Sequence, residues 1–331
     1  MNALTTLIED HLKPYRAPGR SRQTLRAKVR ELGYLVAVAG DVDPADLTPY
    51  DVARLHEQRS LSLSPQSLNT ARSHVATFFG WLEAMHDGAP SAARLMAGWD
   101  RQQGWRKDPT WLAPETFGPL LDAARSPRDR AFLALGLYTL LRGSDIASLR
   151  VGDVDLSTRT LTAVVSKVRH VSTRPIPNEL MAEMRAWLSV YAAQVPLTPD
   201  MYLVPAQAPG TGNRVAGYTP GPLRPQAAIS DPERIVHRAL EGLGLPLAGM
   251  GCHTLRRSGA TALYARLVAE GHADALRVVG LLLGHASVRT TEAYLDPAVT
   301  RDRLDALLAG GMFPTAKSTE LPTPNRRLRA L

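Results

Sequence analysis

LGHASVRTTEAY is the sequence from Leu283 to Tyr294, near the C-terminal end of a 331-residue chain. His285 directly follows the Leu-Gly pair that closes an apolar helical pattern, and Tyr294 comes nine residues later. A tyrosine taken alone is most often a core or interface residue, because its ring is apolar and its hydroxyl finds a hydrogen-bond partner. What Tyr294 does therefore depends on the side chains that the rest of the chain brings to it.

A second motif lies upstream, where His253 and Arg256 stand three residues apart at the start of a predicted helix. Residues three apart share one helix face, so the two side chains point the same way. With nine His and 34 Arg in the chain, chance alone predicts about one such pair. His56 and Arg59 form a second copy. By itself the spacing is more typical of a solvated helix pair than of a site.

The charge composition favours a polyanionic partner. Lys and Arg together number 39 against 31 Asp and Glu, which gives a net charge of +8. Of these cations 34 are Arg, whose planar guanidinium suits phosphate oxygens. Residues 1–100 hold 11 basic and 11 acidic side chains, so the whole excess lies beyond them. Lys167 is the only lysine between residues 108 and 316.

Several classes of protein are excluded by the sequence. The single cysteine, Cys252, rules out a disulfide framework and a Cys-rich zinc site. Because the chain has no run of 18 apolar residues and no secretory pattern at its start, we expect a cytoplasmic protein with no membrane partner. It also lacks the Walker, HExxH and GxSxG motifs, so chemistry on a phosphate would have to rest on side chains alone.

Four segments in the first part of the chain show apolar residues at helical spacing. The predicted helices are 4–12, 22–36, 48–59 and 64–84. They form a helical domain over residues 1–88, and a Gly- and Pro-containing linker follows over 89–110. A basic run without any acid is either a solvated helix face or a stripe that follows DNA phosphates. Its members are Lys13, Arg16, Arg20, Arg22, Arg26, Lys28 and Arg30.

The second part of the chain, residues 111–310, combines helices with a small sheet. Alternating patterns predict three antiparallel strands over 151–156, 160–165 and 169–176. We expect Ser126 to cap one helix and Ser144 to cap the short helix after Arg142, with a Pro- and Gly-rich loop over 205–225. The further predicted helices are 179–193, 232–243, 253–267, 274–283, 288–295 and 299–308. A basic, flexible tail is expected over 311–331.

The order of these motifs resembles the tyrosine recombinase, or λ-integrase, family of phage integrases. The pattern LGHxxxxTTxxY follows HxLRR, which in turn follows an arginine at a helix end. The resemblance covers the whole second part, and the helical first part is similar to the core-binding domain of the family. It implies a mainly α fold of two domains, a helical N-terminal core-binding domain and an α+β catalytic domain with a small three-stranded antiparallel sheet.

The resemblance also implies a set of site residues. Those that match the catalytic positions of the family are Arg142, Lys167, His253, Arg256, His285 and Tyr294. Asp145 matches the acidic position that supports the first arginine, and Lys167 lies in the turn between the second and third predicted strands. Arg257 follows the HxxR pair where the family often has His.

Such a set can cut DNA without a metal ion, another cofactor or ATP. A tyrosine hydroxyl that attacks a phosphodiester forms a 3′-phosphotyrosyl bond and releases a 5′-hydroxyl, and the bond energy kept in that link makes the step reversible. Two arginines and two imidazoles can neutralise the charge that develops on the phosphate oxygens. Tyrosine has an ordinary pKa near 10, so His253 is the candidate proton acceptor and Lys167 the candidate acid for the leaving 5′-oxygen.

We therefore expect a site-specific DNA recombinase that holds double-stranded DNA between its two domains. The resemblance implies a homotetramer in the synaptic complex, and a monomer or dimer when the protein is free. One alternative is a nicking-closing enzyme like type IB topoisomerases, which share the chemistry. Another is a catalytically silent DNA-binding protein of the same fold. Phage integration, mobile-element movement and chromosome-dimer resolution all remain open as biological roles.

Overall fold

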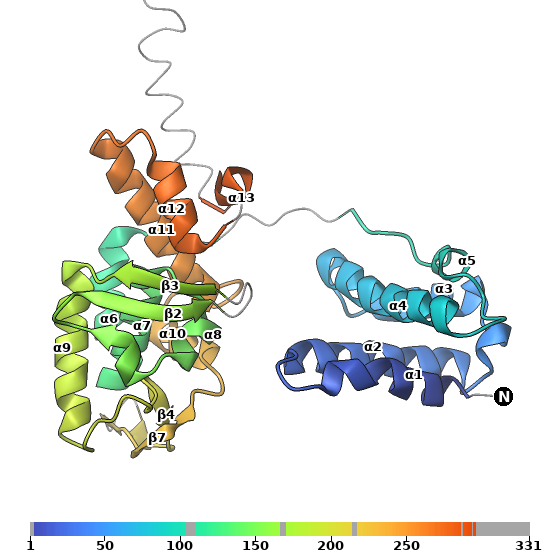
Figure 1. The fold of residues 1–331 in the computed structure, drawn as a ribbon, viewed down its shortest axis with the longest axis horizontal. Helices are drawn as coiled ribbons and strands as arrows, with labels where there is room; N and C mark the ends of the chain where they lie inside the picture. Colours follow the sequence, from blue (N-terminus) through green and yellow to red (C-terminus); the bar gives the residue numbers. More distant parts are fainter. Residues whose placement is uncertain are drawn as a thin grey trace, which may run out of the picture. The chain divides into compact units, whose positions relative to one another are not determined.

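The computed structural model describes residues 3–103, 110–165, 170–213, 217–285, 287–292 and 294–295, without the side chains at 165, 170, 213 and 217. The chain divides into two compact units, Met1–Lys107 and Asp108–Leu331 (Figure 1). Lys167, the predicted helix over 299–308 and the tail over 311–331 lie outside the described residues. No described helix is long and apolar enough to cross a membrane.

The first unit is built on four helices that agree closely with the prediction. They are α1 (Leu4–Leu12), α2 (Arg22–Ala39), α3 (Pro49–Ser60) and α4 (Pro65–Met85). Ser21, Thr48 and Ser64 cap α2, α3 and α4, each accepting a hydrogen bond from a backbone N–H of the first turn. The apolar faces meet in one core whose members include Leu32, Leu35, Val75, Phe78, Phe79 and Leu82.

The first unit also contains residues that the sequence assigns to a linker. A short helix, α5 (Ala92–Met96), packs on α3 and α4, and Leu95 and Trp99 are completely buried. The Trp99 carbonyl accepts a hydrogen bond of 2.7 Å from Arg72 Nε. A five-residue helix is too short to show a helical period, which is why composition alone suggested a linker over 89–110.

Helix α7 (Pro127–Thr139) lies at the centre of the second unit. Every residue from Ala131 to Leu137 is buried, because neighbouring elements cover all faces of the helix. Helices α9 (Asn178–Ala192) and α11 (Cys252–Ala269) pack against it. The contact with α11 is very close, since a Cβ at Gly259 would lie 1.9 Å from the Leu137 carbonyl oxygen. Helices α6 (Phe117–Asp122), α8 (Gly143–Ser148) and α10 (Glu233–Gly242) surround this centre.

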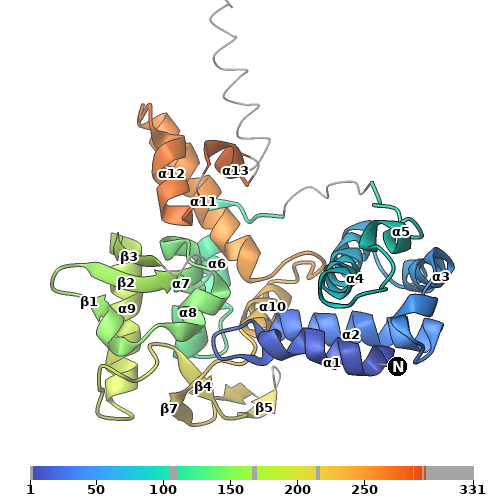
Figure 2. The same cartoon turned by 45° about the vertical axis from the view of Figure 1, so that its right-hand side comes forward.

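The predicted three-stranded sheet is present beside α9 (Figures 1 and 2). Its strands β1 (Val154–Asp155), β2 (Thr160–Val165) and β3 (His170–Pro175) are antiparallel in chain order. The expected loop over 205–225 is instead two short ribbons. Their strands are β4 (Pro205–Gln207) with β7 (Leu223–Ala228), and β5 (Thr211–Asn213) with β6 (Gly217–Thr219). Three-residue strands rich in Pro and Gly carry no alternation that a sequence pattern can detect.

The end of the described chain forms a separate small core on α11. Helix α12 (Ala275–Leu283) packs on α11, and the short helix α13 (Val288–Glu292) packs on α12 (Figure 2). Leu140, at the end of α7, joins this core. The fold class predicted from the sequence is confirmed: the chain is mainly α, with an all-helical first unit and an α+β second unit.

Candidate active site

The turn between α7 and α8 positions Arg142. Leu140 adopts the left-handed conformation with φ of 56°, which is uncommon for a residue other than Gly and turns the chain sharply. Arg142 then occupies the N-cap position of α8, where the sequence analysis expected Ser144. Its Nη1 atom lies 3.8 Å from the Oδ2 atom of Asp145, a carboxylate that is completely buried. Asp145 is thus placed beside Arg142, and its supporting role stays a prediction.

Arg256 lies in the first turns of α11 and is 2% exposed. Its Nη1 donates to the Leu140 carbonyl at 2.7 Å, and its Nη2 donates to the Leu283 carbonyl at 2.6 Å. Both carbonyls stand at helix C-termini, where backbone oxygens have no partner within the helix. The guanidinium is thus fixed between the end of α7 and the end of α12.

The turn at Gly284 and the short helix α13 bring His285 and Tyr294 to the same place. Gly284 ends α12 in the left-handed conformation with φ of 63°, a conformation that glycine adopts without strain. His285 follows directly, and its Nδ1 lies 3.2 Å from Thr291 Oγ1. The rings of His285 and Tyr294 meet edge to face with centroids 5.3 Å apart. Arg257, whose guanidinium is 4.9 Å from the Tyr294 ring centroid, donates from Nε to the Tyr294 carbonyl at 3.2 Å.

The charges of the site act on one another. Burial raises the pKa of Tyr294, while Arg256, Arg257 and Arg142 act in the opposite direction by favouring the phenolate. Desolvation lowers the pKa of His253, and the charges of Arg256 and Arg257 lower it further. His253 is therefore neutral at pH 7 and can accept a proton. The residue lies in the first turn of α11 and keeps part of its surface open to solvent.

Three polar groups of the site are buried and lack a close hydrogen-bond partner among the described residues, although the Tyr294 hydroxyl interacts with Arg256 and Arg142 Nη1 lies 3.8 Å from Asp145. They are the Tyr294 hydroxyl, Arg142 Nη1 and Arg256 Nε. Buried polar groups in proteins are normally satisfied by other protein groups, by water or by a ligand. Two of the three belong to guanidinium groups and the third is a phenol hydroxyl, all of which can donate to the acceptor oxygens of an anion.

The sequence alone did not predict a place for Arg174 in the site, nor a role for Arg257. Arg174, on β3, is 3% exposed and donates to the carbonyls of Thr139 and Leu282. A signal for it exists, because Arg174 pairs with the buried Leu161 across the sheet and so occupies an inward position. A charged residue at such a position is rare unless it has partners or a function. Lys167 lies outside the described residues, so its role stays a prediction.

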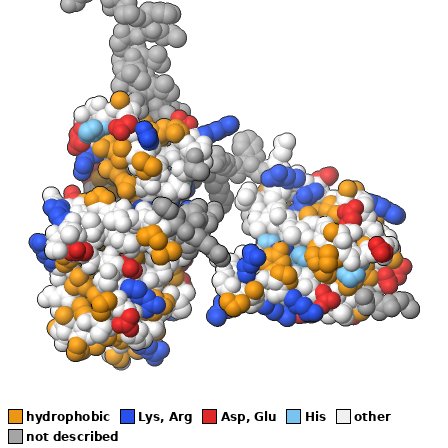
Figure 3. Space-filling model, viewed as in Figure 1, with side chains coloured by type: hydrophobic (Ala, Val, Ile, Leu, Met, Phe, Trp, Pro, Cys, Tyr) orange, Lys and Arg blue, Asp and Glu red, His pale blue; other side chains and the backbone are white. Residues whose placement is uncertain are grey.

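The basic run of the first unit separates into two groups. Lys28 is 3% exposed, with its Nζ 3.4 Å from His11 Nε2 and 4.6 Å from the Tyr15 ring centroid, and burial lowers its pKa. It is therefore unavailable on the surface. The exposed members are Lys13, Arg16, Arg20, Arg22, Arg26 and Arg30. Figure 3 shows Lys and Arg side chains along the part of this unit that α1 and α2 form.

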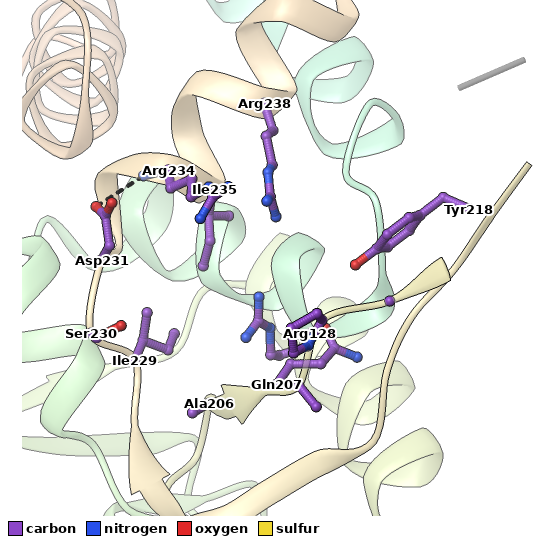
Figure 4. A pocket seen from close by; sticks show the side chains of 13 residues that line it. Arg128, Ala206, Gln207, Tyr218, Ile229, Ser230, Asp231, Arg234, Ile235 and Arg238 are labelled. Carbon is purple, nitrogen blue, oxygen red and sulfur yellow. Dashed lines mark hydrogen bonds between the residues drawn. The ribbon is translucent and has the colours of Figure 1, made fainter. Parts of the chain in front are cut away.

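A cavity of about 320 Å³ lies in the second unit between α10 and the β4–β7 region (Figure 4). Tyr218 and Arg238 direct their polar ends towards this space, and Arg128 lies at its base. The Arg128 guanidinium is held by the Asp129 carboxylate and the Pro205 carbonyl. None of the six predicted catalytic and supporting residues that the structure describes lines this cavity.

The second unit thus brings the side chains of Arg142, Arg256, His285 and Tyr294 together, the residue types and order that resemble the tyrosine recombinases. Residues 110–301 match the model of the phage integrase family. The chain is 31% identical over 303 residues to "Tyrosine recombinase XerC" of Mycobacterium sp. (strain KMS), which covers 86% of this chain and 91% of the relative. It therefore belongs to the phage integrase family, as a tyrosine-type site-specific recombinase, and the resemblance inferred from the sequence is confirmed.

Solved structures share the fold. One is the XerH site-specific recombinase bound to a palindromic difH substrate, with a TM-score of 0.66, 18% identity, and coverage of 93% of this chain and 84% of that one. Another is a λ integrase tetramer bound to a Holliday junction, with a TM-score of 0.64, 17% identity, and coverage of 89% and 77%.

Proposed function

We propose that this chain cuts and rejoins double-stranded DNA at specific sites through a 3′-phosphotyrosyl bond to Tyr294, without a metal ion or ATP. The observation that carries the proposal is the buried Tyr294 hydroxyl. It interacts with Arg256 and lies within the field of three arginines, Arg256, Arg257 and Arg142, which favour its phenolate. A phosphodiester group carries the negative charge and the acceptor oxygens that this site needs.

The arginines hold the phosphate in the proposed reaction. The guanidinium groups of Arg142 and Arg256 are already held by protein contacts, Arg142 beside Asp145 and Arg256 on the carbonyls of Leu140 and Leu283. Donors that are fixed before the reaction stabilise the charge of the transition state without first having to reorganise. His285, held by Thr291 against the Tyr294 ring, is the further donor to a phosphate oxygen.

The proton balance follows from the pKa directions. The Tyr294 oxygen forms a bond to phosphorus while the bond from phosphorus to the 5′-oxygen breaks. The neutral His253 takes the tyrosine proton: its lowered pKa keeps the ring unprotonated at neutral pH, so it is free to accept. Arg256, Arg257 and Arg142 lower the pKa of Tyr294 against the effect of its burial, and so favour release of the proton. Lys167 gives a proton to the leaving 5′-oxygen in our proposal. Attack by a 5′-hydroxyl reverses every step and rejoins the strand.

The proposal includes a tetramer on two recombination sites, a monomer or dimer in the free state, and a cytoplasmic location. The λ integrase tetramer on a Holliday junction and the XerH complex with difH show assemblies of relatives on DNA. The first unit would add phosphate contacts, and the best candidates are Arg20, Arg22 and Arg26. They are exposed and form no ion pair with the described residues.

The experiment traps the covalent intermediate. A library of nicked duplexes, in which cleavage releases a short strand and prevents rejoining, is incubated with the protein and with Tyr294→Phe. We expect wild-type protein to capture one family of duplexes covalently and Tyr294→Phe to capture none. A covalent complex with Tyr294→Phe would overturn the proposal.

Two duplexes that carry the captured site then separate the alternatives. Recombinant products support the proposed function, whereas relaxation of supercoiled DNA without recombinants supports a topoisomerase-like enzyme. Tight, salt-sensitive binding without any covalent complex supports a silent DNA-binding protein.

A further inference from the structure

Arg174 makes the same kind of contact as Arg256 and to the same pair of helices. Arg174 Nη1 donates to the Thr139 carbonyl at 2.7 Å and to the Leu282 carbonyl at 2.5 Å. Arg256 donates to the next carbonyl in each helix, those of Leu140 and Leu283. Two buried guanidinium groups thus join the C-terminal end of α7 to the C-terminal end of α12.

The charge of Arg174 suits this position. Carbonyl oxygens at a helix C-terminus lack partners within the helix and carry a partial negative charge, so a cation there is stabilised. Burial and the nearby charges of Arg256 and Arg142 lower the pKa of Arg174 to about 10, while Asp145 opposes them. The guanidinium therefore stays protonated at neutral pH, although it is buried beside two like charges.

The two helix ends that Arg174 joins lead directly into the active site. Arg142 follows Thr139 by three residues, and His285 follows Leu282 by three residues. Arg174 itself lies on β3, which begins three residues after Lys167 in the sequence. A single side chain therefore connects the chain segments that supply three of the predicted catalytic residues.

We propose that Arg174 is a positioning residue for DNA strand cleavage, which sets the ends of α7 and α12 so that Arg142 and His285 meet the same phosphate. At 3% exposure it is too deeply buried to reach DNA, so it acts through these neighbours. The inference rests on the proposed function of Tyr294. Arg256 differs from Arg174 in that it also faces the Tyr294 ring, with its guanidinium carbon 6.0 Å from the ring centroid.

The test compares Arg174→Met and Arg174→Lys with Arg128→Lys. Arg128 is a matched control, because it is also a buried arginine of the second unit that donates to a backbone carbonyl. It lines the cavity in Figure 4 instead of the candidate active site. The measurements are the single-turnover rate of covalent complex formation at saturating nicked duplex, the amount of active protein from the reaction amplitude, the affinity for DNA, and the melting temperature.

We expect Arg174→Met to slow cleavage by about 100-fold, the effect of misplacing reacting groups by about 1 Å. Its affinity for DNA should stay near that of the wild type. Arg174→Lys should restore part of the rate, because an ammonium group keeps the charge and can donate to the same carbonyls. Arg128→Lys should lower the melting temperature and leave the single-turnover rate of the active fraction unchanged.

A purely structural role would give a different result. Both Arg174 variants would then lower the melting temperature or the reaction amplitude but cleave at the wild-type rate per active molecule, and the inference would be wrong. If Arg174→Met does not fold, Arg174→Lys decides, since a wild-type rate for that variant also overturns the inference. Failure of the wild-type protein to form any covalent complex would refute the proposed function instead.

Discussion

Replacement of Gly259 by Ala tests how the crossing of two helices controls the site. A Cβ at this position would lie 1.9 Å from the Leu137 carbonyl oxygen and 2.9 Å from Leu140 Cδ2. Ordinary contact begins at 3.4 Å, so α7 and α11 must move apart by about 1.5 Å at this point. The nearest obstacle is backbone, which cannot rotate away as a flexible side chain would.

This displacement reaches the reacting groups directly. Arg256 lies on α11 three residues before Gly259, and α7 leads through Leu140 to Arg142. Overpacking of this kind lowers the free energy of unfolding by about 1–3 kcal/mol. A shift of about 1 Å between catalytic groups lowers the rate about 100-fold, so we expect a large loss of cleavage in the fraction that remains folded.

The assay combines single-turnover cleavage of a nicked duplex with urea unfolding. Gly33→Ala is the matched control, because a Cβ there meets nothing within 4 Å and the position is inside α2. It should raise the free energy of unfolding by about 0.5–1 kcal/mol and leave cleavage unchanged. Wild-type cleavage and an unchanged urea midpoint for Gly259→Ala would refute the reasoning.

Three further predictions address the base, the first unit and the DNA surface. The cleavage rate should rise with pH through the lowered pKa of His253, since only the neutral ring accepts a proton. His253→Gln should remove this rise from the pH profile and slow cleavage about 100-fold. A wild-type rate that does not depend on pH would contradict this. Arg59→Met should lower the free energy of unfolding in urea by about 3–5 kcal/mol, because it leaves the buried Glu31 without its two hydrogen bonds from Arg59. A change below about 1 kcal/mol would show that Arg30 alone is enough to pair with Glu31. Arg22→Gln should reduce the salt dependence of DNA binding by about one phosphate contact, and an unchanged slope in a salt titration would exclude that contact.

The elements that were predicted well are those whose helical pattern extends over several turns and whose ends carry clear capping residues. Helices α2 and α4 have apolar faces of several turns, and the N-caps Ser21 and Ser64 mark where they begin. Helix α5 was missed because five residues show no period, although Trp99 behind it is completely buried. The ribbons of β4 to β7 were missed because short strands rich in Pro and Gly resemble a loop.

The candidate site was predictable where the order of residues carries information. Arg142, His253, Arg256 and Tyr294 come from distant parts of the chain, and only the succession of motifs links them before the fold is known. Arg174 escaped prediction because its partners are backbone carbonyls, which no sequence pattern displays. The same holds for Lys28, which a basic run places on the surface and tertiary packing buries.

The central claim concerns one oxygen atom, the hydroxyl of Tyr294. The most direct measurement is mass spectrometry of the protein after reaction with a nicked duplex and digestion of the DNA and the chain. We predict that the peptide carrying Tyr294 bears a nucleotide linked through a 3′-phosphate, and that the released strand ends in a 5′-hydroxyl. A nucleotide on any other residue, or a strand cut without any protein-linked nucleotide, would contradict the account.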